Sequence, residues 1–174
     1  MLKNAYHLAL FALLWATASA QTTWGGLRFG MSEQQVKAAL GRRALRDKDG
    51  ALVVKNINLH GFHGDAAFGF SETSKRLEVI VIMLFPRDCV DAQDGHAPDE
   101  HQAIERQVAA AFLWKDLSAK YGKPVTSECD HTYDCKAVWQ TSSSAILKAH
   151  VLGLDDYPIA IMLDYMPKAG LGEL

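Results

Sequence analysis

The sequence feature that constrains the fold most is a glycine and a proline that recur at the same spacing in two stretches of the chain. Gly41 and Gly122 each follow an amphipathic stretch that predicts a helix, and the two glycines lie 81 residues apart. Pro86 and Pro167 each close the last apolar strand predicted in their stretch, again 81 residues apart. Self-similarity at a fixed spacing is typical of a duplicated unit, so we expect two copies of one helix-plus-strands arrangement.

The first expected unit spans residues 21–86 and begins with a short helix. Ser32 is a suitable N-cap, because Gln35 completes a capping box and Met31 can pack against Val36. The last strand predicted in this unit is almost continuously apolar, which is typical of a strand in the middle of a sheet. The predicted strands cover 52–59, 65–70 and 77–85.

The second expected unit spans residues 99–167, and an acidic linker loop over 87–98 precedes it. Asp99 is a suitable N-cap with Gln102 at the third helical position, and Pro124 prevents the helix from continuing. The apolar positions of this helix form a wide stripe that suits packing on a sheet. They are Ile104, Val108, Ala111, Trp114, Leu117 and Tyr121. Strands are predicted over 137–141, 145–152 and 159–166, and a flexible tail over 168–174.

These elements predict the α+β fold class. We expect two tandem α-β-β-β units that form an antiparallel sheet, with the helices packed on one face. An antiparallel sheet covered on one side leaves its other face available for binding.

Residues 1–20 have the pattern of a secretory signal peptide that is cleaved between Ala20 and Gln21. Lys3 supplies the positive start, an apolar stretch follows, and 18–20 is a small-residue cleavage site. Residue 21 is not cysteine, so no lipid anchor is expected. No later apolar run approaches the roughly 18 residues that a membrane helix needs. We therefore expect a soluble periplasmic or secreted protein without a transmembrane anchor.

The charge balance excludes some partners. The chain has 18 Lys and Arg against 20 Asp and Glu, a net charge of −2, and loss of Lys3 with the signal peptide makes it −3. A weakly acidic protein is a poor match for nucleic acid or for a polybasic membrane patch. The sequence contains no G-x-S-x-G, H-E-x-x-H, P-loop or G-x-G-x-x-G motif, so we assign no catalytic residue and no cofactor.

The segment 30–41 resembles a known family motif. Preceded by Phe29, it reads G-M-S-x-x-x-V-x-x-x-L-G. This is similar to the repeat of the outer-membrane assembly lipoproteins of the BamE (SmpA/OmlA) type. The helix–strand order is also similar to the two tandem units of the β-lactamase inhibitory proteins. The resemblance implies a fold, while activity and binding residues are not carried over, because the lipoprotein cysteine and a second G-M-S are missing.

Three cysteines allow several arrangements. Cys129 and Cys135 lie six residues apart in a polar loop, and an exported protein is expected to pair them as a disulfide. A metal site is the alternative, because His131 and Asp134 lie between them. Cys89 is the odd thiol and can also pair with either of the other two.

Two histidines, His60 and His63, lie in a glycine-bearing turn. Such a pair can bind a transition metal, but the sequence supplies no third ligand at a suitable spacing, so a solvated turn is the preferred interpretation and no metal site is assigned. A metal-dependent hydrolase that uses these histidines together with the Cys129–Cys135 loop is the second alternative function.

The favoured hypothesis is a non-catalytic protein-binding module of the bacterial cell envelope, acting in assembly or as a scaffold. Candidate anchors for a partner are Trp24, Phe29, Tyr133 and Trp139, because aromatic side chains dominate interface energetics. Trp24 and Trp139 can equally cover the edges of the core. The partner would be another envelope or secreted protein. A periplasmic inhibitor or immunity protein is the alternative.

Overall fold

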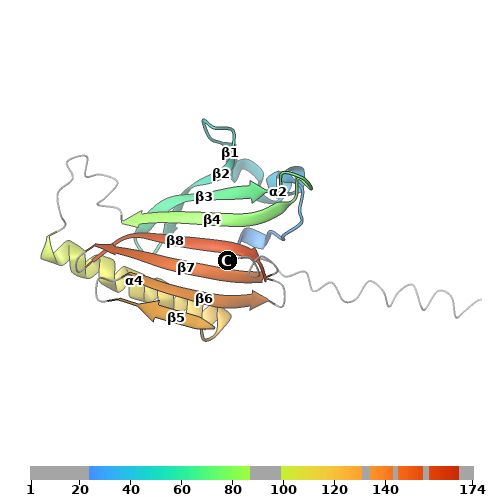
Figure 1. The fold of residues 1–174 in the computed structure, drawn as a ribbon. Coiled ribbons are helices and arrows are strands. Elements are labelled where there is room, and N and C mark those ends of the chain that lie inside the picture. Colours follow the sequence, from blue (N-terminus) through green and yellow to red (C-terminus); the bar gives the residue numbers. More distant parts are fainter. Residues whose placement is uncertain (1–23, 87–98, 131–133, 143–144, 155–156, 169–174) are drawn as a thin grey trace, which may run out of the picture.

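Eight strands and two α-helices make up the described part of the chain (Figure 1). The computed structural model describes residues 24–86, 99–130, 134–142, 145–154 and 157–168. The helices are α2 (Glu33–Leu40) and α4 (Glu100–Tyr121), and the 3-10 turns are η2 (Trp24–Gly26) and η3 (Gly41–Arg43). The strands are β1 (Ala44–Arg46), β2 (Leu52–Leu59), β3 (Phe62–Phe70), β4 (Leu77–Pro86), β5 (Thr126–Cys129), β6 (Cys135–Ser142), β7 (Ala145–Leu154) and β8 (Tyr157–Pro167).

The expected fold class of two tandem α-β-β-β units with helices packed on one face is wrong. The described residues have only two α-helices, which do not pack equivalently, and they form mainly a single antiparallel sheet of eight strands. Its order is β1-β2-β3-β4-β8-β7-β6-β5, and β4 pairs with β8 at the centre, with Ile82 opposite Leu163. The edge strands β1 and β5 are absent from the prediction. Their three and four residues are almost all exposed, so no alternation of apolar and polar residues marks them in the sequence.

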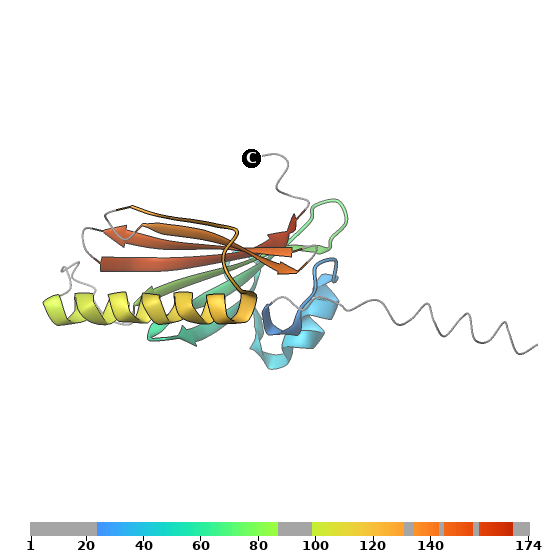
Figure 2. The same ribbon diagram turned by 90° about the horizontal axis from the view of Figure 1, so that it is seen from below.

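The two helices do not form equivalent layers over this sheet. α2 has only eight residues and sits at one end of the sheet beside η2, whereas α4 has 22 residues and runs alongside the strands (Figure 2). α4 contacts β6 and β8. The helical cover of the sheet is therefore supplied mainly by α4.

Both predicted helix starts are confirmed as capping boxes. Ser32 accepts a hydrogen bond from the Gln35 backbone N–H at 3.3 Å, and the Gln35 side chain accepts one from the Ser32 N–H at 2.8 Å. Asp99 and Gln102 make the same pair of bonds at 2.8 and 3.0 Å. Each capping box satisfies two of the backbone N–H donors that the start of a helix leaves without a partner. A segment of four residues is therefore enough to fix where the helix begins.

The core lies between the sheet and the two helices. Alternate residues of the central strands point into it, including Ile80 and Ile82 of β4 and Leu163 of β8, all at most 1% exposed. Leu113 and Leu117 of α4 close the core from the other side. The two halves of the chain thus share one apolar cluster.

The predicted apolar face of α4 is partly wrong. Ile104 and Val108 were expected to face the sheet, but they are 52% and 48% exposed. The buried positions are Arg106, Leu113 and Leu117. At 100° per residue Leu113 lies about 140° around the helix from Val108, so a straight helix cannot bury both. The side of α4 that is buried is therefore the one that contacts β6 and β8.

Candidate functional site

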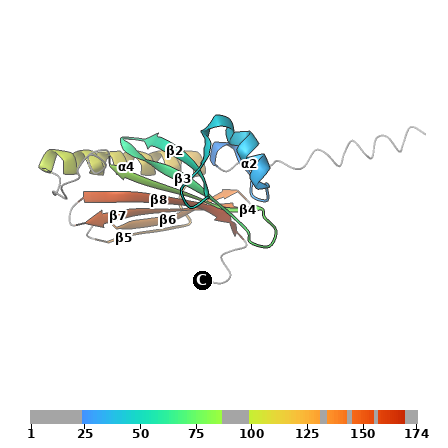
Figure 3. The same cartoon turned by 90° about the horizontal axis from the view of Figure 1, so that it is seen from above.

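One face of the sheet has neither α2 nor α4 over it (Figures 2 and 3). Its side chains come from the residues that alternate with the core positions on the four strands at and beside the centre. We call this surface the outer face and define it by Val79, Val81 and Met83 of β4, Met162, Asp164 and Met166 of β8, Lys148 and His150 of β7, and Lys136 of β6.

The strand register sets these side chains side by side in rows. Val81, Asp164 and Lys148 follow one another across β4, β8 and β7. Met83 and Met162 lead the neighbouring row, which continues through His150 and Lys136. Val81, Met83, Met162, Asp164 and Met166 are half-buried, because cross-strand neighbours on one sheet face cover one another. The outer face is therefore apolar along β4 and β8 and becomes charged toward β6.

Asp164 is the carboxylate in the apolar part of this face. Burial raises the pKa of its carboxyl, while the charges of Lys148 and His150 act in the opposite direction. A carboxylate loses hydration when apolar neighbours surround it, which disfavours its charged form. Asp164 thus places a poorly hydrated acidic group in the middle of an apolar surface.

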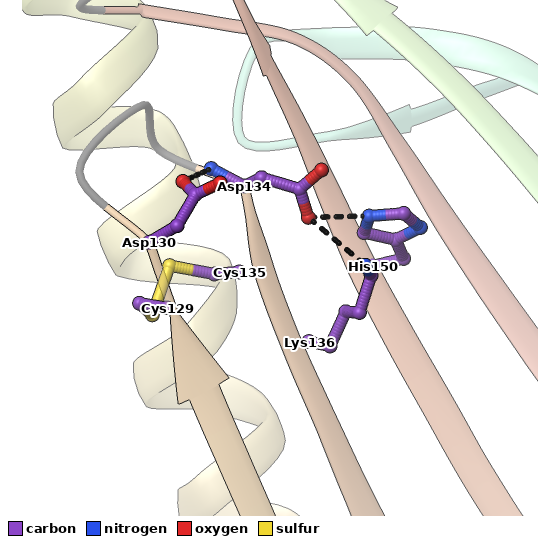
Figure 4. Close-up of a disulfide and its surroundings, with 6 residues drawn as sticks. All are labelled: Cys129, Asp130, Asp134, Cys135, Lys136 and His150. Atoms are coloured by element: carbon purple, nitrogen blue, oxygen red, sulfur yellow. Dashed lines mark hydrogen bonds and ion pairs between the residues drawn. A yellow bond between two sulfur atoms is a disulfide. The ribbon is translucent and has the colours of Figure 1, made fainter.

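The charged end of the outer face is organised around Asp134. Its Oδ1 lies 2.7 Å from His150 Nε2 and 3.5 Å from Lys136 Nζ. Figure 4 shows the Asp134 carboxylate pointing toward both side chains. The Asp134 N–H donates to the Asp130 side chain at 3.1 Å, which holds the start of β6 in place. These contacts pair the histidine with a neighbouring acid.

The disulfide between Cys129 and Cys135 lies beside this cluster. The two cysteines are directly opposite each other across β5 and β6. Their sulfur atoms are bonded to each other as a disulfide, so these two thiols are not free to hold the metal that was considered as the alternative. Cys89, Tyr133 and His131 lie outside the described residues.

Trp139 was predicted as a surface anchor, and this assignment is corrected. Its side chain is fully buried, packs edge-on against Trp114 at 5.1 Å and donates from Nε1 to the Gly122 carbonyl at 3.0 Å. Trp24 and Phe29 are half-buried against the core, and Trp24 lies 6.1 Å from Phe68. Trp24, Phe29 and Trp139 therefore do not lie together on one surface.

His60 and His63 also take different roles. His60, in the turn between β2 and β3, lies 2.8 Å from the Asp116 carboxylate of α4 and stacks on Phe112 at 6.0 Å. His63 follows in β3, where it pairs with Phe85 of β4. Within the described ranges, no three histidine, cysteine or acidic side chains group as a metal site requires.

The sequence predicts that one face of the sheet stays free, but it does not identify the residues of the outer face. Along β8 the side chains alternate between core positions such as Leu163 and outer positions such as Met162 and Asp164. Methionine is apolar, so the strand reads as a nearly unbroken apolar run. Asp164 inside that run was the one signal of a second, partly hydrated face.

Comparison with known proteins finds no matching family model, no similar curated protein and no similar solved structure. The resemblance to the BamE type and to the β-lactamase inhibitory proteins accordingly stays an expectation.

Neither helix of the described residues combines the length and the apolarity that crossing a membrane requires.

Proposed function

We propose that the protein is an exported, non-catalytic protein-binding module of the bacterial cell envelope, acting in assembly or as a scaffold, and that it binds its partner through the outer face. The observation that carries this proposal is the apolar surface along β4 and β8, which neither helix covers. Contiguous apolar surface rimmed by polar groups is typical of interaction sites.

The composition of the outer face suits a protein partner. Met83, Met162 and Met166 are flexible and polarizable, so they adapt to the shape of an apposed surface. The charged end with Asp134, Lys136 and His150 offers the polar rim that fixes orientation.

The disulfide supports the exported location within this proposal. Structural disulfides persist in oxidising compartments, and Cys129 with Cys135 forms one here. The pattern of residues 1–20 in the sequence agrees with that location.

A crosslinking pull-down of the mature protein from envelope extract tests this function, with Met162→Arg as the binding variant. Arginine at this half-buried position puts a long charged side chain into the apolar part of the outer face, so we expect at least a tenfold loss of partner recovery. Val125→Arg is the matched control, because Val125 is 68% exposed and lies outside the outer face.

The identity of the captured protein decides between the alternatives. Outer-membrane assembly components, confirmed with the purified partner, support the proposal. A single secreted enzyme or toxin instead favours an inhibitor or immunity protein. Equal recovery with Met162→Arg and Val125→Arg, both still folded, would exclude the outer face as the binding surface.

A further inference from the structure

α4 carries a second apolar surface on the side turned away from the core. Ile104, Val108 and Phe112 are spaced four residues apart, so they lie one above another on the helix. They are 52%, 48% and 50% exposed. We call these three residues the α4 stripe.

The fold does not need the α4 stripe. Leu113 and Leu117, on the opposite side of the helix, hold α4 to the sheet, together with Trp114 against Trp139. Large apolar side chains left half-exposed in a continuous row are typical of an interface.

One end of the α4 stripe is already held in position. The His60 ring stacks on Phe112 at 6.0 Å with an interplanar angle of 17°. Asp116, one turn further along α4, fixes the same imidazole at 2.8 Å. Phe112 is therefore supported from one side while half of its surface stays accessible, which lowers the entropy lost on binding.

The α4 stripe is complementary to itself. It has Val108 at its centre and one large apolar side chain four residues away on each side. A second copy of α4 laid antiparallel, with Val108 on the two-fold axis, brings Ile104 of one copy to Phe112 of the other. A two-fold interface uses the same patch on both subunits, which is the property that this spacing provides.

The charges along α4 favour the same arrangement. Glu100 and Glu105 are exposed toward the N-terminal end of the α4 stripe, and Lys115 is exposed beyond its C-terminal end. Asp116 beside Lys115 is also exposed, but its carboxylate is paired with His60. Antiparallel packing sets Lys115 of one copy between the Glu100 and Glu105 positions of the other. Antiparallel packing also makes the two helix dipoles run in opposite directions, which is favourable. Parallel packing would instead place like charges next to each other.

We infer that the protein forms a two-fold symmetric homodimer through the α4 stripe, with the two α4 helices antiparallel. The outer face lies on the other side of the sheet and stays free in this dimer (Figure 2). Dimer formation therefore does not depend on the function proposed above.

Sedimentation equilibrium of the mature protein over a concentration series tests the dimer. We expect the wild type to approach twice the monomer mass and Val108→Asp to stay monomeric, because the variant buries two carboxylates against each other. Val125→Asp is the matched control at another exposed valine and should dimerise like the wild type. A wild type that stays monomeric, or two variants that dissociate alike, would overturn the inference.

Cysteine crosslinking in a Cys89→Ser background tests the register. Val108→Cys should crosslink to itself, because the residue faces its own copy across the two-fold axis. Phe112→Cys alone should not, since its two copies are displaced by about 12 Å along the helices, but it should crosslink when mixed with Ile104→Cys. Self-crosslinking of Phe112→Cys as efficient as that of Val108→Cys would contradict the antiparallel register.

Discussion

Trp139 is the largest fully buried side chain among the described residues, and its position explains why a tryptophan is needed there. The indole fills the space beneath Trp114, and its N–H satisfies the carbonyl of Gly122, the residue that ends α4. The side chain thus joins β6 to the C-terminal end of α4 through both packing and a hydrogen bond.

Trp139→Ala should lower the free energy of unfolding by about 3–5 kcal/mol, because it removes a large buried ring and leaves a cavity. Trp139→Phe should lower the free energy of unfolding by less, chiefly because it loses the hydrogen bond to Gly122, which contributes about 1 kcal/mol. Urea denaturation followed by circular dichroism measures both. If Trp139→Ala kept the stability of the wild type but lost partner binding, Trp139 would be a surface anchor for the partner after all.

Asp164 makes stability depend on pH in an unusual direction. Burial raises the pKa of its carboxyl, so the folded state holds the proton more tightly than the unfolded state. The free energy of unfolding therefore falls as pH rises from the unfolded pKa, about 3.9, through the higher folded pKa.

Asp164→Asn should accordingly melt at a higher temperature than the wild type at pH 7, and the difference should vanish below about pH 4. Thermal melts over a pH series measure this. Glu78→Gln, which removes an acidic charge at an exposed position of β4, is the control. A lower melting temperature for Asp164→Asn at pH 7 would mean that attraction to Lys148 and His150 outweighs burial.

At the scale of elements, the β3–β4 pair depends on glycines that allow close approach. A Cβ at Gly64 would lie 1.8 Å from the Met83 backbone oxygen, whereas a Cβ at Gly69 would lie 2.4 Å from the Val79 side chain. A backbone carbonyl in a strand ladder cannot move without breaking register, but a valine side chain can rotate.

Gly64→Ala should therefore destabilise the protein by at least about 1–3 kcal/mol, and by more than Gly69→Ala does. Hydrogen exchange should show the loss of protection concentrated in β3 and β4. Equal destabilisation by the two substitutions would show that the backbone contact at Met83 is not the decisive one.

The β5 edge strand depends on its disulfide. All four residues of β5 are exposed, so little apolar burial holds the strand against β6. Closing a loop of six residues restricts the unfolded chain, and in the chain-entropy model this stabilises by about 2 kcal/mol.

Cys129→Ala with Cys135→Ala should lower the free energy of unfolding by about that amount. Amide protection should be lost in β5 while β3 and β4 keep theirs, because only the edge strand relies on the bridge. Hydrogen exchange with mass spectrometry measures this, and a loss spread evenly over the sheet would contradict a local role.

At the scale of the whole molecule, the two halves of the chain are one folding unit. β4 and β8 pair at the centre of the sheet, and the core cluster draws on strands from both halves together with α2 and α4. Neither half can keep its central strand buried without the other.

Calorimetry should therefore record one cooperative unfolding transition. Ile82→Ala, in the central strand, should shift the whole transition to lower temperature and cost about 2–5 kcal/mol. Two separate transitions, or a shift that affects only one half, would show that the halves fold independently.

The sequence by itself determined the features that depend on near neighbours. The capping boxes at Ser32 and Asp99 need only four residues each, and the six predicted strands are all present, β2 with the predicted bounds and the other five longer than predicted. The pairing of Cys129 with Cys135 was also predicted from their short separation and from the expected export, and the structure contains this disulfide.

Only the tertiary structure decided which surfaces meet. Which side of α4 is buried, whether Trp139 is core or surface, and how Asp164 becomes half-buried all depend on the placement of strands far apart in sequence. Burial is a property of the assembled layers, while caps and turns are properties of a few consecutive residues. For this reason the sequence pattern did not predict the short edge strands β1 and β5.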